Sequence, residues 1–202
     1  MIMMKNTCFI ALLILLATSV KAQVSLDNPS FEAPPKDATM PPGWEGCGSY
    51  TTPDIMPGKN EYGQPIWDVT HRPTHGSTYM GMITREDNTW EYVGQRLSKP
   101  LKRQHCYMFS MDLASSPYYA GYNTPIRLRV WVGNSLCEKT ELIAESPTIP
   151  HYEWKNYQFV FAVDKSYSHI IFEAVYADGT VYPYRGNLLI DNVSMITDCD
   201  RA

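Results

Sequence analysis

Short segments of alternating residues constrain the fold of this chain more than any other feature. The segment IRLRVWV at residues 126–132 alternates four aliphatic side chains with two arginines and a tryptophan. Successive side chains of a strand point to opposite faces, so this pattern predicts a half-buried β-strand. Further short segments rich in aromatic and β-branched residues follow Gly76, separated by turn residues: STYMGMIT, TWEYVGQRLS, HCYMFSMDLA, EWKNYQFVFAV, SHIIFEAVYA and NLLIDNVSMIT.

No window of the sequence shows a convincing amphipathic helix. Regular short strands with turns between them predict an all-β fold, a two-sheet antiparallel β-sandwich of the jelly-roll type. Residues 24–73 are instead rich in Pro, Gly, Asn and Asp, which forbids long helices and long central strands. Trp44, Ile55 and Ile66 recur there as apolar anchors, so we expect long ordered N-terminal loops over a core.

The first 22 residues have the pattern of a signal peptide. Lys5 precedes an apolar run, and small Ala22 stands at a plausible cleavage position. An uncleaved membrane anchor is the alternative. We therefore expect residues 23–202 to form a single β-sandwich domain that is secreted, periplasmic or held at the cell surface.

Charge argues against a nucleic-acid partner. The leader holds two of the 17 basic residues and none of the 21 acidic ones, so the mature chain has 17 − 2 = 15 basic and 21 acidic side chains, formally −6. No basic run appears, and no second apolar segment approaches membrane-spanning length.

Four cysteines follow the leader: Cys47, Cys106, Cys137 and Cys199. Export to an oxidising compartment predicts disulfides, and the sequence leaves all three pairings open. Zinc is the rival interpretation, but no close Cys or His spacing favours it.

A carboxylate in the last predicted strand is the first indication of a site. In LLIDNVSM, Asp191 shares a face with Leu189, Val193 and Met195. A carboxylate on an apolar face is costly unless it is paired, hydrogen-bonded or bound to a metal. The opposite face is only half apolar, so the pattern does not settle which face meets the core.

Three motifs in order, NPSFE, HGSTYMGM and LLIDNVSM, resemble the galactose-binding-like jelly-roll family, which includes many carbohydrate-binding modules of bacterial glycoside hydrolases. The chain also resembles secreted and cell-surface proteins of Bacteroidetes. The resemblance implies a structural calcium ion shared by the side chains of Glu32 and Asp191, with carbonyl oxygens from Ser30 and from Gly76–Ser77. A metal-free, hydrogen-bonded pair of carboxylates is the alternative.

Two loops concentrate aromatic residues that suit stacking on a sugar ring. SSPYYAGYNTP carries Tyr118, Tyr119 and Tyr122, and YADGTVYPYRGN carries Tyr182, Tyr184 and Arg185. We predict that these residues bind a ligand. Packing at the rim of the sandwich is the alternative for each tyrosine.

The segment TREDNTWE offers Arg85 as a clamp and Trp90 as a platform for the same ligand. The alternative is an ordinary hairpin turn whose charged side chains are solvated and bind no ligand. Catalysis is disfavoured, because adjacent Glu86 and Asp87 point to opposite sides of an extended chain.

The sequence thus predicts a non-catalytic module, stabilised by calcium, that binds a glycan or another cell-surface ligand through aromatic loops. An envelope assembly protein with a protein partner is a second hypothesis, and a polysaccharide hydrolase is a third.

Overall fold

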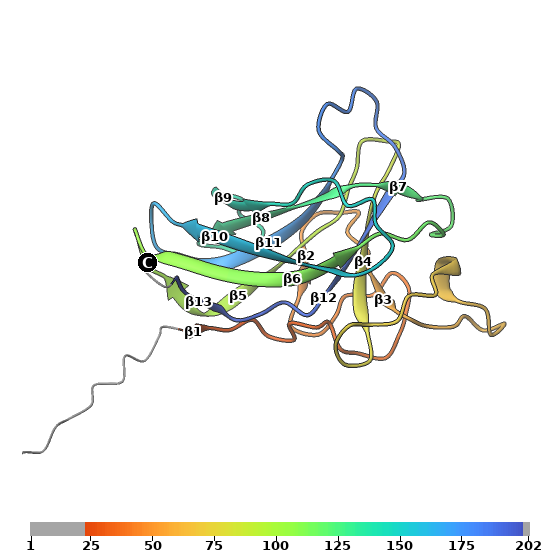
Figure 1. Ribbon diagram of the computed structural model, residues 1–202, viewed down its shortest axis with the longest axis horizontal. Coiled ribbons are helices and arrows are strands. Elements are labelled where there is room, and N and C mark those ends of the chain that lie inside the picture. Colours follow the sequence, from red (N-terminus) through yellow and green to blue (C-terminus); the bar gives the residue numbers. More distant parts are fainter. Residues whose placement is uncertain (1–22, 200–202) are drawn as a thin grey trace, which may run out of the picture.

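A computed structural model describes residues 23–199, which form two antiparallel sheets packed face to face (Figure 1). The predicted signal peptide lies outside the described residues. The eight-stranded sheet has the order β1-β13-β6-β12-β4-β3, with β10 also paired to β6 and the short β7 paired in parallel to β12. Its strands are β1 (Gln23–Val24), β3 (Asp54–Met56), β4 (Tyr79–Thr84), β6 (Cys106–Ala114), β7 (Thr124–Pro125), β10 (Lys155–Ala162), β12 (Gly186–Asp191) and β13 (Ile196–Asp198).

The five-stranded sheet has the order β2-β5-β11-β8-β9. Its strands are β2 (Glu45–Gly46), β5 (Tyr92–Leu101), β8 (Arg127–Gly133), β9 (Glu141–Glu145) and β11 (Tyr167–Val175). One 3₁₀ helix, η1 (Ile66–Asp68), is the only helix among residues 23–199. No helix in this range is long and apolar enough to cross a membrane. The two sheets confirm the predicted all-β sandwich and its jelly-roll character.

The main core lies between the sheets and follows the alternation of the strands. Leu128 and Val130 of β8 face it, as do Leu188 and Ile190 of β12. Leu189, between the last two, belongs to a second apolar cluster on the opposite face of the eight-stranded sheet. The N-terminal loops cover that face, because Ile66 and Val69 pack into the second cluster. The sequence predicted ordered loops over a core. In the structure these loops also contribute residues to the second apolar cluster.

Two disulfides select one of the three pairings left open by the sequence. Cys47 is bonded to Cys137, and Cys106 is bonded to Cys199. The first joins the loop after β2 to the loop between β8 and β9, across the five-stranded sheet. The second fastens the C-terminal segment to the start of β6.

His71 lies in the loop that covers the second cluster and gives a test of that packing. Its ring is 4% exposed, lies against the ring of Tyr152 and is hydrogen-bonded to the Tyr152 carbonyl. Burial lowers the pKa of His71, an effect that the Tyr152 carbonyl only partly offsets.

We predict that His71 makes the fold less stable in mild acid. Below about pH 6.5 the unfolded chain takes up a proton that the buried imidazole refuses, so the free energy of unfolding falls as pH decreases. Urea denaturation of the wild type and of His71→Gln at pH 7.5 and 5.5 measures this, and the stability advantage of the wild type should shrink at the lower pH. A pH-independent difference would contradict the buried, neutral histidine.

Candidate functional site

The outer face of the five-stranded sheet carries polar and aromatic side chains that the core does not use. Arg127, Arg129 and Trp131 alternate with the core residues of β8, so they point away from the main core. Tyr92 of β5 and Glu173 of β11 lie on the same face, since Glu173 is the register partner of both Tyr92 and Arg129. A row of functional groups therefore crosses three neighbouring strands.

Glu173 organises the aromatic part of this face. Its carboxylate is buried and accepts hydrogen bonds from the indole N–H of Trp90 at 2.8 Å and of Trp131 at 2.7 Å. Lys139 Nζ lies 2.6 Å from Glu173 Oε1 and 4.5 Å from the centroid of the Tyr92 ring. One carboxylate thus fixes two tryptophans, and the lysine that neutralises it also caps a tyrosine ring.

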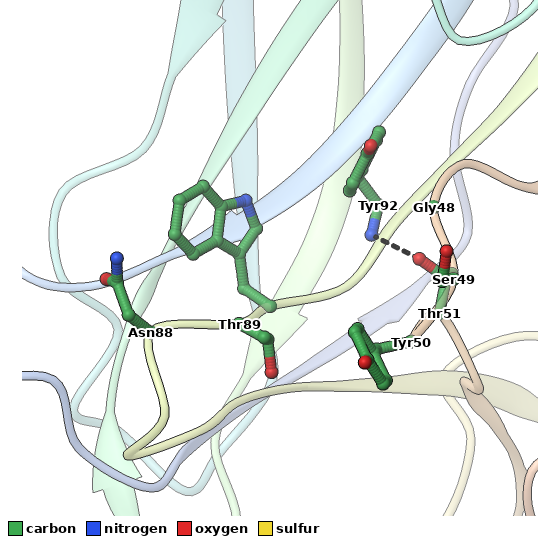
Figure 2. A pocket seen from close by; sticks show the side chains of 8 residues that line it. Gly48, Ser49, Tyr50, Thr51, Asn88, Thr89 and Tyr92 are labelled. Atoms are coloured by element: carbon green, nitrogen blue, oxygen red, sulfur yellow. Dashed lines mark hydrogen bonds between the residues drawn. The ribbon is translucent and has the colours of Figure 1, made fainter.

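A pocket of about 200 Å³ opens between the loop after β2 and the hairpin that joins β4 to β5 (Figure 2). Its lining residues are Gly48, Ser49, Tyr50, Thr51, Asn88, Thr89, Trp90 and Tyr92. The Tyr50 ring is 63% exposed, and the backbone N–H of Tyr92 donates to Thr51 Oγ1 at 3.4 Å. The pocket combines aromatic faces with the hydroxyl and amide groups of its two loops.

A second pocket of about 240 Å³ adjoins the first, because Trp90 lines both. Arg127 and Arg129 line it from β8, and Tyr176 and Asp178 line it from the loop after β11. Arg127 pairs with Asp178, and both arginines pair with Glu145. We call the two pockets and Trp90 between them the sheet-face site.

The two predicted binding residues of the β4–β5 hairpin have different positions. Trp90 lines both pockets of the sheet-face site, and its role as a platform stays a prediction. Arg85 is 18% exposed and pairs at 2.7 Å with the buried Glu91. Burial raises the pKa of Glu91, and the Arg85 charge opposes that rise. Arg85 therefore holds the hairpin together, and its role as a ligand clamp stays a prediction.

The tyrosines of the loop between β6 and β7 lie on the side of the eight-stranded sheet. Tyr118 is 67% exposed, whereas Tyr119 is 2% exposed and its hydroxyl donates to Asp54. Tyr122 packs against the second apolar cluster. Tyr118 presents most of its ring to solvent and Tyr122 is half-buried, whereas a buried Tyr119 has no face to offer a sugar.

The loop between β11 and β12 stands beside the β4–β5 hairpin at the top of the molecule (Figure 1). Arg185 pairs with Glu86 of that hairpin at 2.6 Å, and its guanidinium lies 5.5 Å from the centroid of the Tyr122 ring. Tyr184 is half-buried and donates to the Pro125 carbonyl, while Tyr182 is 81% exposed. Arg185 therefore brings the three predicted segments together, whereas Tyr119 is buried away from solvent.

The predicted metal residues meet around the loop at residues 74–78. Glu32 accepts the backbone N–H of Ser77 at 3.0 and 3.1 Å, and Asp191 accepts the backbone N–H of Thr74 at 2.8 Å and of His75 at 3.0 Å. Gly76 has a φ of 63°, and a β-carbon there would collide with Glu32 Oε1. Ser30, the fifth of these residues, is buried and its Oγ lies 2.9 Å from His75 Nδ1.

Backbone N–H groups are hydrogen-bond donors, so they cannot serve as ligands of a cation. Calcium requires six to eight oxygen ligands, whereas the groups directed at Glu32 and at Asp191 Oδ2 are N–H and O–H donors. Among residues 23–199 no group of three or more His, Cys, Asp or Glu side chains is placed to hold a metal ion. These contacts fit the hydrogen-bonded pair of carboxylates, and they do not fit calcium in this arrangement. Calcium binding itself stays a prediction from the resemblance.

Substitution of Glu32 tests this loop clasp, by which we mean Glu32 and Asp191 on loop 74–78. Glu32→Ala leaves the N–H groups of Ser77 and Thr78 without their acceptor and should cost about 1–3 kcal/mol in the free energy of unfolding. Glu32→Gln keeps one acceptor oxygen and should lose less. Urea denaturation measures both.

Chelator then separates the two versions of the clasp. A clasp made of hydrogen bonds predicts the same thermal midpoint with and without excess EDTA. A fall of the midpoint in EDTA that Asp191→Ala abolishes would contradict it and establish calcium.

The sequence interpretation missed Tyr50, Tyr92, Arg127, Arg129, Trp131 and Glu173 as residues of one face. The alternation of IRLRVWV does place the two arginines and Trp131 away from the core. The alternation does not indicate which strand lies beside β8. The contact between Glu173 and Trp131 was therefore not predictable from either segment alone.

Comparison with known proteins supports the fold. No family model matches the chain, and no curated protein matches it. Among solved structures, a Stig cyclase from Fischerella sp. TAU, in complex with an indole compound, is 14% identical with a TM-score of 0.57, and the match covers 89% of this chain and 98% of that one. The CBM22-1 xylan-binding domain of Paenibacillus barcinonensis Xyn10C is 13% identical with a TM-score of 0.53, covering 92% of this chain and 100% of that one.

Proposed function

We propose that this domain is a non-catalytic module that binds a glycan at the sheet-face site. The observation that carries the proposal is the position of Trp90 between two pockets, with Tyr50 and Tyr92 on one side and Arg127 and Arg129 on the other. Aromatic rings offer a flat apolar surface to the C–H face of a sugar, and guanidinium and amide groups bind its hydroxyls.

The fixed geometry of the face supports binding. Glu173 holds the indoles of Trp90 and Trp131 before a ligand arrives, which reduces the entropy that binding must pay. The chain also resembles a xylan-binding domain in its fold. The sequence identity is 13%, so this likeness supports the architecture alone.

Catalysis has less support at this site. A hydrolase needs one carboxylic acid free to protonate a glycosidic oxygen. Both oxygens of Glu173 already accept hydrogen bonds, from two tryptophans and Lys139, and Asp178 is paired with Arg127. A polysaccharide hydrolase remains the alternative hypothesis, and release of soluble sugar from a polysaccharide would establish it.

Secretion is part of the proposal. The two disulfides support an oxidising compartment, which agrees with export through the leader at residues 1–22. A protein partner in the cell envelope is the other hypothesis carried over from the sequence. Its test is capture of a defined envelope protein by a domain that binds no glycan.

Tyr50→Ala tests the sheet-face site. We expect about tenfold weaker binding of the recognised neutral polysaccharide, since the variant removes an exposed ring that packs against no core cluster. Affinity gel electrophoresis against a panel of neutral polysaccharides, xylan included, measures the change.

Two matched variants control this experiment. Tyr62→Ala removes a ring that is even more exposed, at 78%, and that lies outside both pockets, so it should leave affinity unchanged. Tyr182→Ala tests the loop predicted from the sequence. Loss of binding in Tyr182→Ala with none in Tyr50→Ala would move the site to that loop and contradict our assignment.

A further inference from the structure

A third pocket, of about 300 Å³, lies apart from the sheet-face site, beside η1 and the loop before β3. In Figure 1 the segment carrying η1 extends to the side of the sandwich, away from the paired loops at the top. Pro35 and Ile66 form an apolar wall, brought together because Gly58 has no β-carbon to collide with either side chain. We call this the η1 pocket.

Trp67 presents its ring at the η1 pocket and is 43% exposed. Its φ is 52°, and Asp68 follows with a φ of 63°, so two consecutive residues other than glycine occupy the left-handed region. Such a backbone conformation is strained for residues other than glycine and persists only where the surroundings enforce it. The strained segment carries a large apolar ring that is partly in solvent, although burial of that ring would favour folding.

Asp54 supports the side of the pocket that carries Asp37. Its buried carboxyl accepts the backbone N–H of Ala38 at 2.7 Å, and Ala38 follows Asp37 of the lining. Two isolated β-bridges, Lys36 with Ile55 and Lys59 with Pro65, hold the backbone on either side. The pocket is therefore built from segments whose main chains are fixed.

Two ammonium groups line the η1 pocket without a counter-charge of their own. Within residues 23–199, neither Lys36 nor Lys59 makes an ion pair or a side-chain hydrogen bond, and both are exposed. Asp37 is the one acidic side chain in the lining. In a chain of negative net charge, two unpaired lysines beside an exposed tryptophan are a local excess of positive charge.

We propose that the η1 pocket binds an anionic sugar residue, one that carries a carboxylate or a sulfate group. The ring of that sugar stacks on Trp67, and its anionic group pairs with Lys36 and Lys59. Asp37 and the side-chain amide of Asn60 bind hydroxyls. The chemistry is that of a ligand with an apolar face and a negative charge, and the pocket supplies one feature for each. The proposal rests on the proposed glycan-binding function for the class of ligand, but it uses none of the residues of the sheet-face site.

Binding of three polymers to the mature chain tests this pocket: polygalacturonate, dextran sulfate and neutral dextran. We expect binding of at least one anionic polymer, little binding of neutral dextran, and weakening as sodium chloride rises from 50 to 500 mM. The two anionic polymers distinguish a carboxylate from a sulfate. Trp67→Ala and the double variant Lys36→Ala/Lys59→Ala should each lower that affinity about tenfold or more.

A lysine pair elsewhere provides the matched control. Lys99→Ala/Lys165→Ala removes the same charge from other exposed positions and should leave affinity within about twofold. Should Trp67→Ala disturb folding, as a thermal melt would reveal, the exposed lysine pair still decides the question. Equal losses in the two lysine double variants, or no binding of either anionic polymer by the wild type, would overturn the proposal.

The outcomes also separate the two sites. Tyr50→Ala should leave anionic binding unchanged, and Trp67→Ala should leave binding of the neutral polysaccharide unchanged. Failure of Tyr50→Ala to affect the neutral polysaccharide would refute the sheet-face site, while the η1 pocket would stand or fall on its own variants.

Discussion

The backbone amides of residues 74–78 are the point on which the rest of the fold depends. Glu32, near the start of the described chain, and Asp191, at the end of β12, both accept N–H groups from this one loop. The N–H of Val193 donates to the Pro29 carbonyl at 3.1 Å, so the two ends also meet directly. Because each carboxylate accepts more than one hydrogen bond from this loop, loss of either carboxylate removes the acceptor of several donors at once.

This clasp decides which surfaces are left for a ligand. It draws the N-terminal loops across the outer face of the eight-stranded sheet, where Ile66 and Val69 help to bury a second core. The corresponding face of the five-stranded sheet keeps its row of Tyr92, Glu173 and Arg129 and the pockets beside it. The outer face of the eight-stranded sheet is thus covered while that of the five-stranded sheet stays open, and this difference follows from where the N-terminal loops are fastened.

Period-two alternation predicted the strands and the two faces of β8, because that pattern is local. It also left Asp191 on the face of Leu189, which is where the structure places it, opposite the main core. The fate of each loop tyrosine was not predictable in the same way: Tyr118 and Tyr119 are adjacent, yet one is exposed and the other meets Asp54 from a distant strand. Whether a loop residue is buried depends on contacts with residues that lie far from it in the sequence. No spacing within SSPYYAGYNTP indicates those contacts.

Charge distinguishes the sheet-face site from the η1 pocket more sharply than shape does. Every basic group around the sheet-face site has an acidic partner: Arg127 and Arg129 pair with Glu145, and Lys139 with Glu173. A paired guanidinium still donates hydrogen bonds but attracts little net negative charge, which suits neutral hydroxyls. Lys36 and Lys59 at the η1 pocket form no ion pair within residues 23–199 and outnumber the one acidic residue of the lining, Asp37, so a net positive charge attracts anions there and not at the sheet face. The difference in charge is the reason why we propose a neutral glycan at the sheet-face site and an anionic one at the η1 pocket.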